Sequence, residues 1–462
     1  MYMTTKITSD CLTPVSVFLR IQGRSTCLLE SIPREEDTGR YSIIAFDPVA
    51  KLTYQEGIFT RFDFLTGKTV ETPCTDPLKE MEQHVLRALP SIPNLPLQSG
   101  AIGYAGYDIA ACYEDIGKIP YDELQIPDLA FLLFETFIVI DHQQETLSLI
   151  VENCYSQRSE AEMTAIFEKT KARLTVLSPL ENYPPVDEHL SFTSNMTQQT
   201  YEAVVAQAKE LIKAGDLFQV VPSQRLKAPF AQAPFDYYRK LRVTNPSAYL
   251  YYLDLTDDFK VIGSSPESLI RVNGENIITN PIAGTRKRGQ TKQEDEALAE
   301  ELLADEKERA EHLMLIDLGR NDLGKIAEIG SVTVPLCMVV EKYRYVMHIV
   351  SVVTARRRKQ ITAMDALRAT LPAGTVSGAP KIRAMTRIYQ WESVRRGVYA
   401  GAVGYFSRND QADFAIGIRT MVVKDGYGYV QAGAGVVYDS EPVLEYQETL
   451  HKAKALLEVA AK

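Results

Sequence analysis

The sequence predicts a protein of the mixed α+β class. In the first part of the chain, short runs rich in β-branched and aromatic residues lie between turn residues, which is typical of strands. In the second part, similar runs alternate with segments whose apolar residues recur at helical spacing. No fixed short repeat is present, which excludes a solenoid. With 462 residues, 45% of them hydrophobic, the chain is long enough for two or three domains.

The first part, residues 12–175, is expected to contain mainly strands and a few helices. Its strand candidates are residues 16–21, 41–46, 51–55, 129–141 and 146–153. The spacing of apolar residues predicts helices at 76–89 and 159–177. Residues 1–177 are therefore expected to form an N-terminal domain.

Residues 178–195 are rich in proline, serine and asparagine, so they are expected to link this domain to a second one at 196–462. A helix at 200–216 is expected to end near Gly215, because glycine is favoured at helix C-terminal caps. The remaining strand candidates are residues 259–265, 268–273, 275–282, 343–355, 401–407, 413–425 and 428–438. The remaining helix candidates are residues 294–319, 364–371, 379–392 and 442–462.

One short segment occurs twice. GAIGY at 100–104 returns as GAVGY at 401–405, with a single exchange of isoleucine for valine. The pair either marks matching strands in two related halves or is a coincidence of five residues.

Composition excludes several classes of function. A net charge of −10 argues against general affinity for nucleic acid, which needs a basic surface. The cysteines are scattered without a C-x-x-C pair, which indicates reduced thiols rather than zinc or disulfides. The N-terminus has no apolar signal core, and no run reaches the roughly 18 apolar residues of a membrane helix. A cytoplasmic protein without a membrane partner is expected.

Two pairs of glutamates are the first candidate for chemistry. Glu308 and Glu311 are three residues apart, as are Glu445 and Glu448, so each pair shares one helix face. Carboxylates gathered from separate helices suit Mg²⁺, which takes oxygen ligands and keeps waters for a substrate. The alternative is two solvated helix faces.

Three glycine-containing loops form the second candidate. Residues 279–289 end a strand with a glycine turn and three cations, and residues 374–381 form a glycine-rich turn that opens a helix. The latter suits an anion at a helix N-terminus but is not a P-loop, because two residues separate its second glycine from the lysine. Residues 431–435 allow close approach of a backbone N–H to a ligand. Plain turns, caps and a strand bulge are the alternatives.

Two polar residues lie in apolar, strand-like runs. Arg419 needs a partner if it is buried, which a structural ion pair or the carboxylate of a substrate would supply. His348 is either a structural histidine or an acid–base group.

Ten segments of the second part, in chain order, resemble the motifs of the chorismate-utilising enzyme family. They are GDLFQVVPSQR, GSSPESL, PIAGTRKRG, ERAEHLMLIDLGRND, YVMHIVS, LPAGTVSGAPK, YAGAVGY, FAIGIRT, QAGAG and EYQETLHKA. In the first part, LLES and GRYSIIAFDP are similar to the N-terminal domain of anthranilate synthase large subunits and of the related aminodeoxychorismate synthases. The resemblance implies large antiparallel sheets packed face to face, with helices outside.

Two positions distinguish branches of this family. Ala283 stands where aminodeoxychorismate synthases typically have a lysine nucleophile, and alanine cannot form the covalent adduct. Gln219 stands where salicylate and isochorismate synthases have a lysine that activates water, and glutamine cannot act as a base. Both positions therefore resemble anthranilate synthases, in which ammonia is the attacking group.

By position, the resemblance implies a magnesium site, a substrate site and a catalytic set. Glu311 and Glu448 would bind Mg²⁺ directly, with Glu308 and Glu445 beside them. The chorismate-binding residues would be Ala283, Gly284, Thr375, Tyr399, Arg419, Gly433, Ala434, Gly435 and Lys452. The catalytic residues would be Glu267, His348, Gln219 and Thr285.

Within these sets the resemblance also implies individual roles. Tyr399, Arg419 and the backbone of Gly435 would hold the enolpyruvyl carboxylate of chorismate, and the metal would hold the ring carboxylate. Glu267 would protonate the departing ring hydroxyl, which requires a raised pKa. His348 would assist the later loss of pyruvate.

The implied reaction joins ammonia to chorismate and then eliminates pyruvate to give anthranilate, the first committed step of tryptophan biosynthesis. The sequence contains no glutaminase motif. A separate glutamine amidotransferase subunit is therefore expected to deliver ammonia, in a heterotetramer of two large and two small subunits. The rival activities are an aminodeoxychorismate synthase component I, an enzyme that stops at the aminodeoxyisochorismate intermediate, and a catalytically silent tryptophan-binding regulator.

The resemblance extends to a tryptophan feedback site in LLES and NPSAYLYY. The implied binding residues are Leu29, Glu30, Ser31, Asn245, Pro246, Ser247 and Tyr249. Ala248 stands where many relatives have a second proline, and its loss is expected to weaken tryptophan binding or its coupling to catalysis. The alternative is that LLES serves only packing.

Overall fold

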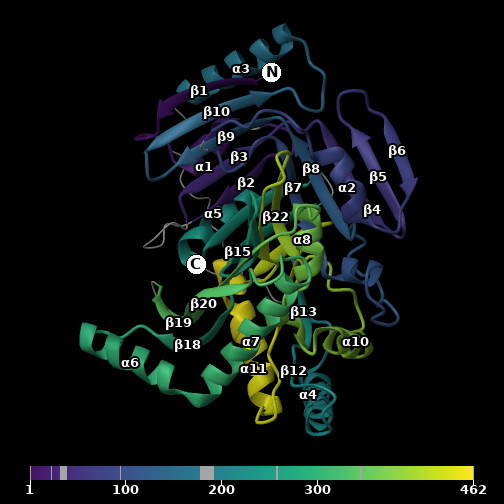
Figure 1. Cartoon of the computed structure of the whole chain (residues 1–462), viewed down its shortest axis with the longest axis vertical. Coiled ribbons are helices and arrows are strands. Elements are labelled where there is room, and N and C mark those ends of the chain that lie inside the picture. The colour runs from purple at the N-terminus through teal and green to yellow at the C-terminus, as the bar shows by residue number, and fades with distance from the viewer. Residues whose placement is uncertain are drawn as a thin grey trace.

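The computed structural model describes residues 2–21, 23–31, 39–93, 95–176, 192–255, 259–343 and 346–460. The predicted linker at 178–195 lies outside these ranges except for its last four residues, so it stays a prediction. The described chain folds into two large antiparallel sheets with helices on their outer sides (Figure 1).

The first sheet has 11 strands and combines both parts of the chain. Its order is β1 (Tyr2–Thr8), β10 (Thr146–Glu152), β9 (Thr136–Asp141), β3 (Tyr41–Ala45), β2 (Cys27–Glu30), β14 (Tyr249–Asp254), β15 (Phe259–Ser265), β24 (Thr420–Lys424), β25 (Tyr427–Gly433), β13 (Ser223–Pro229) and β11 (Thr193–Ser194). The two parts meet where β2 pairs with β14.

The second sheet has 12 strands and is built in the same way. Its order is β18 (Ile282–Lys287), β20 (Val346–Arg356), β17 (Asn276–Thr279), β16 (Ser268–Asn273), β23 (Ala412–Ile416), β22 (Ala402–Ser407), β7 (Gly100–Ala105), β8 (Leu129–Phe134), β4 (Ala50–Gln55), β5 (Ile58–Asp63) and β6 (Thr69–Pro73), with β19 (Thr333–Lys342) also on β20. The repeated GAIGY and GAVGY segments are β7 and β22, and they pair directly, Gly103 opposite Gly404.

Apolar side chains form one layer between the sheets and one layer outside each. The inner layer joins Ile43 of the first sheet to Leu132 of the second. Outside the first sheet lie α1 (Pro14–Ile21), α3 (Glu160–Thr175), α5 (Pro234–Thr244) and α11 (Pro442–Leu457). Outside the second lie α2 (Pro77–Val85), α4 (Gln198–Lys213), α7 (Glu306–Gly324), α8 (Ala363–Thr370) and α10 (Lys381–Trp391). The expected face-to-face sheets with outer helices are confirmed.

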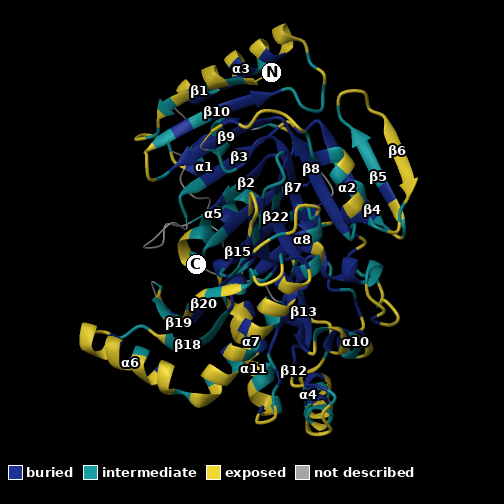
Figure 2. Cartoon of the chain, in the orientation of Figure 1, coloured by how far each residue is buried: buried dark blue, intermediate teal, exposed yellow. Residues whose placement is uncertain are grey.

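The remaining elements are short or peripheral. They are α6 (Lys292–Ala304), α9 (Gly374–Ser377), a two-stranded ribbon of β12 (Gln219–Val220) and β21 (Gly378–Ala379), and two 3-10 turns at Tyr107–Cys112 and Glu458–Ala460. Helix α6 extends away from the body and is largely exposed, whereas the central strands of the sheets are buried and the edge strand β6 is exposed (Figure 2).

Several predictions about elements were wrong in detail, among them the strand at 275–282, which is interrupted at 280–281. Residues 16–21 form a helix, not a strand, because Val17 and Ile21 are one turn apart and both pack under the first sheet. The single helix at 294–319 is two helices, since Asp305 caps α7 by accepting hydrogen bonds from two backbone N–H groups. The strand at 129–141 is interrupted at Glu135, and the strand at 413–425 is interrupted before Thr420.

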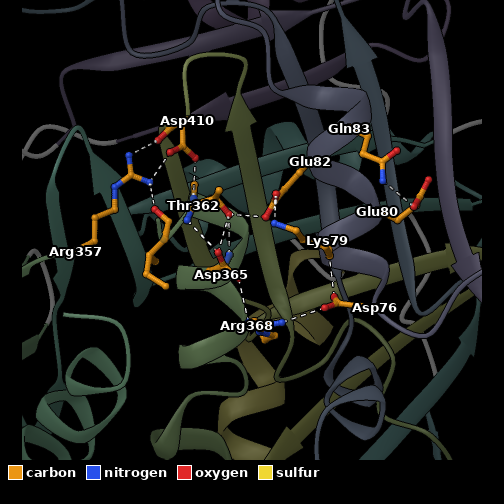
Figure 3. A network of polar contacts seen from close by, with 12 residues as sticks. Asp76, Lys79, Glu80, Glu82, Gln83, Arg357, Thr362, Asp365, Arg368 and Asp410 are labelled. Atoms are coloured by element: carbon orange, nitrogen blue, oxygen red, sulfur yellow. Dashed lines mark hydrogen bonds and ion pairs between the residues drawn. The ribbon is translucent and has the colours of Figure 1, made fainter. Parts of the chain in front are cut away.

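A polar network fastens the outer helices of the two chain parts to one another (Figure 3). Thr362 donates to Glu82 at 2.7 Å, and Arg368 pairs with Asp76 at 3.0 Å, so α8 is held against α2. The predicted domain boundary stays a prediction, but both sheets and this network cross it.

All six cysteines are free thiols. Within the described residues, no helix has the length and apolar character to cross a membrane.

Candidate active site

A cavity of about 240 Å³ gathers most of the predicted site. The predicted residues that line it are Gln219, Glu267, Ala283, Thr285, Glu311, His348, Thr375, Tyr399, Arg419, Gly433 and Lys452. They come from strands of both sheets, from the short ribbon and from helices α7, α9 and α11. The cavity therefore exists only when all these elements are assembled.

The predicted residues outside the lining are Gly284, Ala434, Gly435, Glu308, Glu445 and Glu448. Two of the glycines lie so close to side chains of the site that a larger residue would displace them. A Cβ at Gly435 would lie 2.9 Å from Gln219 Nε2. Gly284 has a φ of +68° at a register shift in β18, and a Cβ there would lie 3.1 Å from Glu308 Oε2.

Glu267 lies in the turn between β15 and β16, with 8% of its surface exposed. Burial raises the pKa of its carboxyl group to about 8, although a hydrogen bond with Thr375 and the positive charge of Lys452 both act to lower this pKa. The group is therefore protonated at neutral pH, as a general acid must be.

Gln219 is buried in β12 and faces α7 across the cavity. Its Nε2 donates to Glu311 Oε1 at 3.0 Å, while its Oε1 is buried without a hydrogen-bond partner among the described residues. An unsatisfied buried acceptor is unfavourable unless a ligand donates to it. An N–H donor such as ammonia fits this position.

His348 in β20 is oriented by the bulge of β18. Its Nδ1 lies 3.0 Å from the carbonyl oxygen of Gly284 and 3.0 Å from Thr285 Oγ1. A carbonyl only accepts, so Nδ1 carries the proton in the neutral ring, and Nε2 is the nitrogen that can take one up.

Arg419 lies in the interruption between β23 and β24, not within a strand as predicted, and its φ is +48°. Its guanidinium forms no hydrogen bond or ion pair with the described residues, and burial lowers its pKa. A half-buried, always-charged group of this kind is stabilised by an anion, and a carboxylate matches its geometry. Burial likewise raises the pKa of Tyr399 to about 12, so its hydroxyl stays a donor.

The four predicted metal ligands are on two helices, and of these four only Glu311 lines the cavity. Burial raises the pKa of Glu311 on α7 and of Glu445 on α11. Glu308 is paired with Arg286 at 3.4 Å, and Glu448 with Lys452 at 2.6 Å. No three acidic, histidine or cysteine groups of the described residues converge as a metal centre.

The donor set nevertheless suits Mg²⁺. This ion commonly takes one or two protein carboxylates and completes its shell with water and substrate oxygens. Carboxylates whose pKa is raised by burial gain from a nearby divalent cation, because it favours their charged form.

The predicted regulatory residues lie at a second cavity of about 380 Å³. Leu29, Glu30, Ser31 and Tyr249 line it, whereas Asn245, Pro246 and Ser247 form the turn before β14 and do not. The carboxylate of Glu30 is already bound by Arg242 at 2.8 Å and by the hydroxyl of Tyr238.

A short chain of hydrogen bonds connects this turn to the first cavity. The hydroxyl of Ser264 donates to the carbonyl of Asn245, and its backbone N–H donates to the carbonyl of Arg419 at 3.0 Å. Tyr249 is opposite Ser265, two residues before Glu267. Strand β15 thus links Arg419 to the Asn245 turn, and it links the segment before Glu267 to Tyr249 of the second cavity.

Sequence reasoning missed the apolar walls of both cavities and several polar residues. Val221, Ile282, Leu315, Val376, Ile418 and Leu456 line the first cavity, and nothing in their spacing sets them apart from core residues. In the second cavity it missed Arg271 and Asp413, which are paired at 3.3 Å. Gln431, a polar residue within the QAGAG motif, also lines the first cavity and was missed.

Comparison with known proteins gives a consistent picture. A family model described as chorismate binding enzyme matches residues 26–458. The chain is 53% identical over 456 residues to anthranilate synthase component 1 of Lactococcus lactis, covering 98% of both chains. The crystal structure of anthranilate synthase component I from Streptococcus pneumoniae has a TM-score of 0.84 and 44% identity, covering 98% of this chain and 99% of that one. A menaquinone-specific isochorismate synthase of Escherichia coli, with a TM-score of 0.75 and 19% identity over 100% of this chain and 95% of its own, shares the fold.

Proposed function

The chain belongs to the family of chorismate binding enzymes, and from that premise we propose that it is an anthranilate synthase component I. It would convert chorismate and ammonia to anthranilate and pyruvate in the presence of Mg²⁺. The observation that carries the proposal is the lining of one cavity by Glu267, Arg419, Gln219 and Ala283 together. The first two suit chorismate chemistry, and the last two suit ammonia as the attacking group.

Substrate binding follows from the charges around the cavity. Chorismate carries two carboxylates, and the guanidinium of Arg419 can bind one of them in a bidentate manner. The buried hydroxyl of Tyr399 can donate to the same carboxylate, beside the backbone at Gly433. Lys452, which contacts the Gly433 carbonyl at 3.2 Å, adds positive charge at the rim.

Glu311 and Glu448, with Glu308 and Glu445 beside them, would hold Mg²⁺. When bound, the ion neutralises the ring carboxylate of chorismate and fixes its position. Without it, a third carboxylate would approach Glu311, whose pKa is already raised by burial and by Glu308.

The first chemical step requires proton donation to a leaving hydroxyl. Glu267 is protonated at neutral pH and lines the cavity, so it can protonate the C–O bond that breaks and let water leave. Gln219 can accept a hydrogen bond from ammonia through its unsatisfied Oε1, which positions the nucleophile.

The second step eliminates pyruvate and makes the ring aromatic. His348 can take up a proton at Nε2 while Gly284 and Thr285 hold Nδ1. Ala283, next to this bulge, presents only a methyl group, so it offers no amine that could attack the substrate.

Ammonia and regulation complete the proposal. Ammonia would come from glutamine through a separate amidotransferase subunit, in a complex of two large and two small cytoplasmic subunits. Tryptophan would occupy the cavity of about 380 Å³ and act on Glu267 and Arg419 through β15. Binding energy at one site must then change affinity at the other reciprocally.

The test is an assay of the purified chain with chorismate, Mg²⁺ and ammonium, following anthranilate fluorescence and pyruvate together. Equal appearance of the two products is the expected result. Chorismate consumption without pyruvate would instead identify an aminodeoxychorismate or aminodeoxyisochorismate synthase. An absence of any consumption by the chain alone and with its amidotransferase would contradict an enzymatic role.

A further inference from the structure

A small cavity, called the inner cavity below, adjoins the substrate cavity at Glu267. Its volume is about 40 Å³, and it shares Glu267, Leu315 and Thr375 with the substrate cavity. Its other polar wall residues are Ser268, Thr279, Asp322 and Thr370. A polar cavity of this size has room for about two waters.

Asp322 lines the inner cavity together with Glu267. It is on α7, 5% exposed, and its carboxylate is paired with Lys381 at 2.5 Å and with Lys325 at 3.2 Å. Both lysines line an outer cavity of about 380 Å³ on the other side of the pair. The cations of that outer cavity, Arg368 and Arg358 included, are already bound to carboxylates or carbonyls, so it is not built to hold an anion.

A row of ionisable groups therefore runs from the substrate cavity to the outer cavity. Its order is Glu267, the inner cavity, Asp322 and then Lys381. Resting on the proposed function, we propose that Asp322 and Lys381 form a proton relay that returns a proton to Glu267 through the inner cavity, on the side away from the substrate.

The reaction creates the need for such a route. Glu267 gives its proton to the hydroxyl that departs as water, and substrate then blocks the front of the cavity. A water in the inner cavity donates a proton to the Glu267 carboxylate, and the Lys381–Asp322 pair donates to that water. The amine of Lys381 then takes a proton from solvent in the outer cavity. The amine formed from ammonia releases its surplus proton to solvent as the products leave, so the turnover takes up one proton through the relay and gives one back.

The environment of Lys381 suits this role. Burial lowers the pKa of its ammonium group, which makes the group a better proton donor than an ordinary lysine. The negative charges of Asp322 and Glu114 act to raise this pKa, and the positive charge of Lys325 lowers it further. Its Nζ also donates to the carbonyl of Thr370 at 3.0 Å, which fixes it at the boundary of the two cavities.

Two variants test the relay by different means. Asp322→Asn removes the titratable group. Gly319→Ala leaves every titratable group in place, but it adds a methyl group to the wall of the inner cavity, 3.2 Å from Thr279 Cγ2. Their matched controls are on the same helix: Asp317→Asn, with 71% of the side chain exposed, and Gly324→Ala, where a Cβ meets open space.

Both test variants are expected to lower kcat about tenfold, with KM for chorismate unchanged within about twofold and a larger solvent deuterium isotope effect on kcat. The controls are expected to match the parent. An unchanged kcat in both test variants, or a lower kcat without a larger isotope effect, would overturn the relay.

A second measurement decides the relay even if the chain makes no anthranilate. The carbonyl infrared band of protonated Glu267, identified by its loss in Glu267→Gln, is followed after a pH jump across pH 8, with benzoate filling the substrate cavity. Slower loss of the band in Asp322→Asn and Gly319→Ala than in the parent supports the relay. Equal rates refute it, whereas failure of the proposed function alone would leave this difference intact.

Discussion

Replacing Glu267 by glutamine should lower kcat strongly and stabilise the protein at alkaline pH. The carboxyl group has a pKa of about 8 in the fold instead of its ordinary 4.5, chiefly because it is buried. Glutamine has nearly the same shape but no proton to donate. We expect kcat to fall by about 10²–10⁴.

The effect on stability follows from the same burial. At about 1.4 kcal/mol for each pKa unit, ionising Glu267 inside the cavity is about 5 kcal/mol less favourable than in the unfolded chain. Below pH 4.5 the carboxyl group is protonated in both the folded and the unfolded chain. The parent and Glu267→Gln should therefore have similar stability there. Between that pH and about 8 only the unfolded chain ionises, and the parent loses stability relative to Glu267→Gln with each pH step.

The assay is thermal unfolding of parent and variant from pH 5 to pH 9. Since unfolding entropy is about 2.1 cal/mol/K per residue, a 462-residue chain shifts by about 1 °C per kcal/mol. The variant should therefore unfold about 5 °C above the parent at pH 9, with little difference at pH 5. The control Glu168→Gln, on the exposed face of α3, should follow the parent throughout.

Activity provides the second readout. The parent's kcat/KM should decline as pH rises through about 8, because Glu267 loses its proton there. Parallel melting curves for parent and variant at every pH would refute the reasoning, since they would mean that Glu267 is ionised in the folded protein.

Three further outcomes follow from the site. Arg419→Met should raise KM for chorismate about 10- to 100-fold in steady-state kinetics, because a charge-assisted hydrogen bond to a carboxylate contributes about 1.5–3 kcal/mol; an unchanged KM would remove Arg419 from the binding site. Ser264→Ala should raise the tryptophan concentration for half-inhibition about three- to tenfold at unchanged KM, because it removes the hydrogen bond that links Asn245 to the strand beside Arg419. Unaltered inhibition would mean that the coupling runs through other residues. EDTA should abolish anthranilate formation and excess Mg²⁺ should restore it, whereas full activity in EDTA would contradict the glutamate assignment.

The class of the fold could be predicted because most strands carry their signal locally. The runs at 41–46, 51–55 and 146–153 are strands in the structure, and the helices at 159–177 and 200–216 end near the predicted residues. Gly215 has the positive φ of +78° that a helix C-terminal glycine allows. The sheet order could not be predicted from local sequence, because strand pairs such as β2–β14 and β7–β22 join residues that are far apart in the chain.

The interpretation of residues 16–21 as a strand shows why local signals fail. Valine, phenylalanine and isoleucine favour strands, but Pro14 begins a helix and the apolar face formed by Val17 and Ile21 is buried under the first sheet. Tertiary packing overrides propensity there.

The polar part of the site was predictable through motifs, and its environment was not. The strand-like surroundings of Arg419 left it open to a structural role, and Glu267 was singled out only by the ten ordered motifs. The burial that raises the pKa of Glu267 depends on Leu315 and Ile418, whose apolar character is shared with any core residue. The inner cavity at Glu267 had no sequence signal at all.

The pairing of β7 with β22 also determines how the protein is made. Roughly 300 residues separate these neighbours, so at about 5–20 residues per second the ribosome needs about 15–60 s to deliver the partner strand. During that time the strands β2 and β7 present open hydrogen-bonding edges next to apolar side chains, a known hazard for aggregation. We therefore expect the yield in cells to respond to translation speed and to chaperones that cover these edges, more than the final stability does.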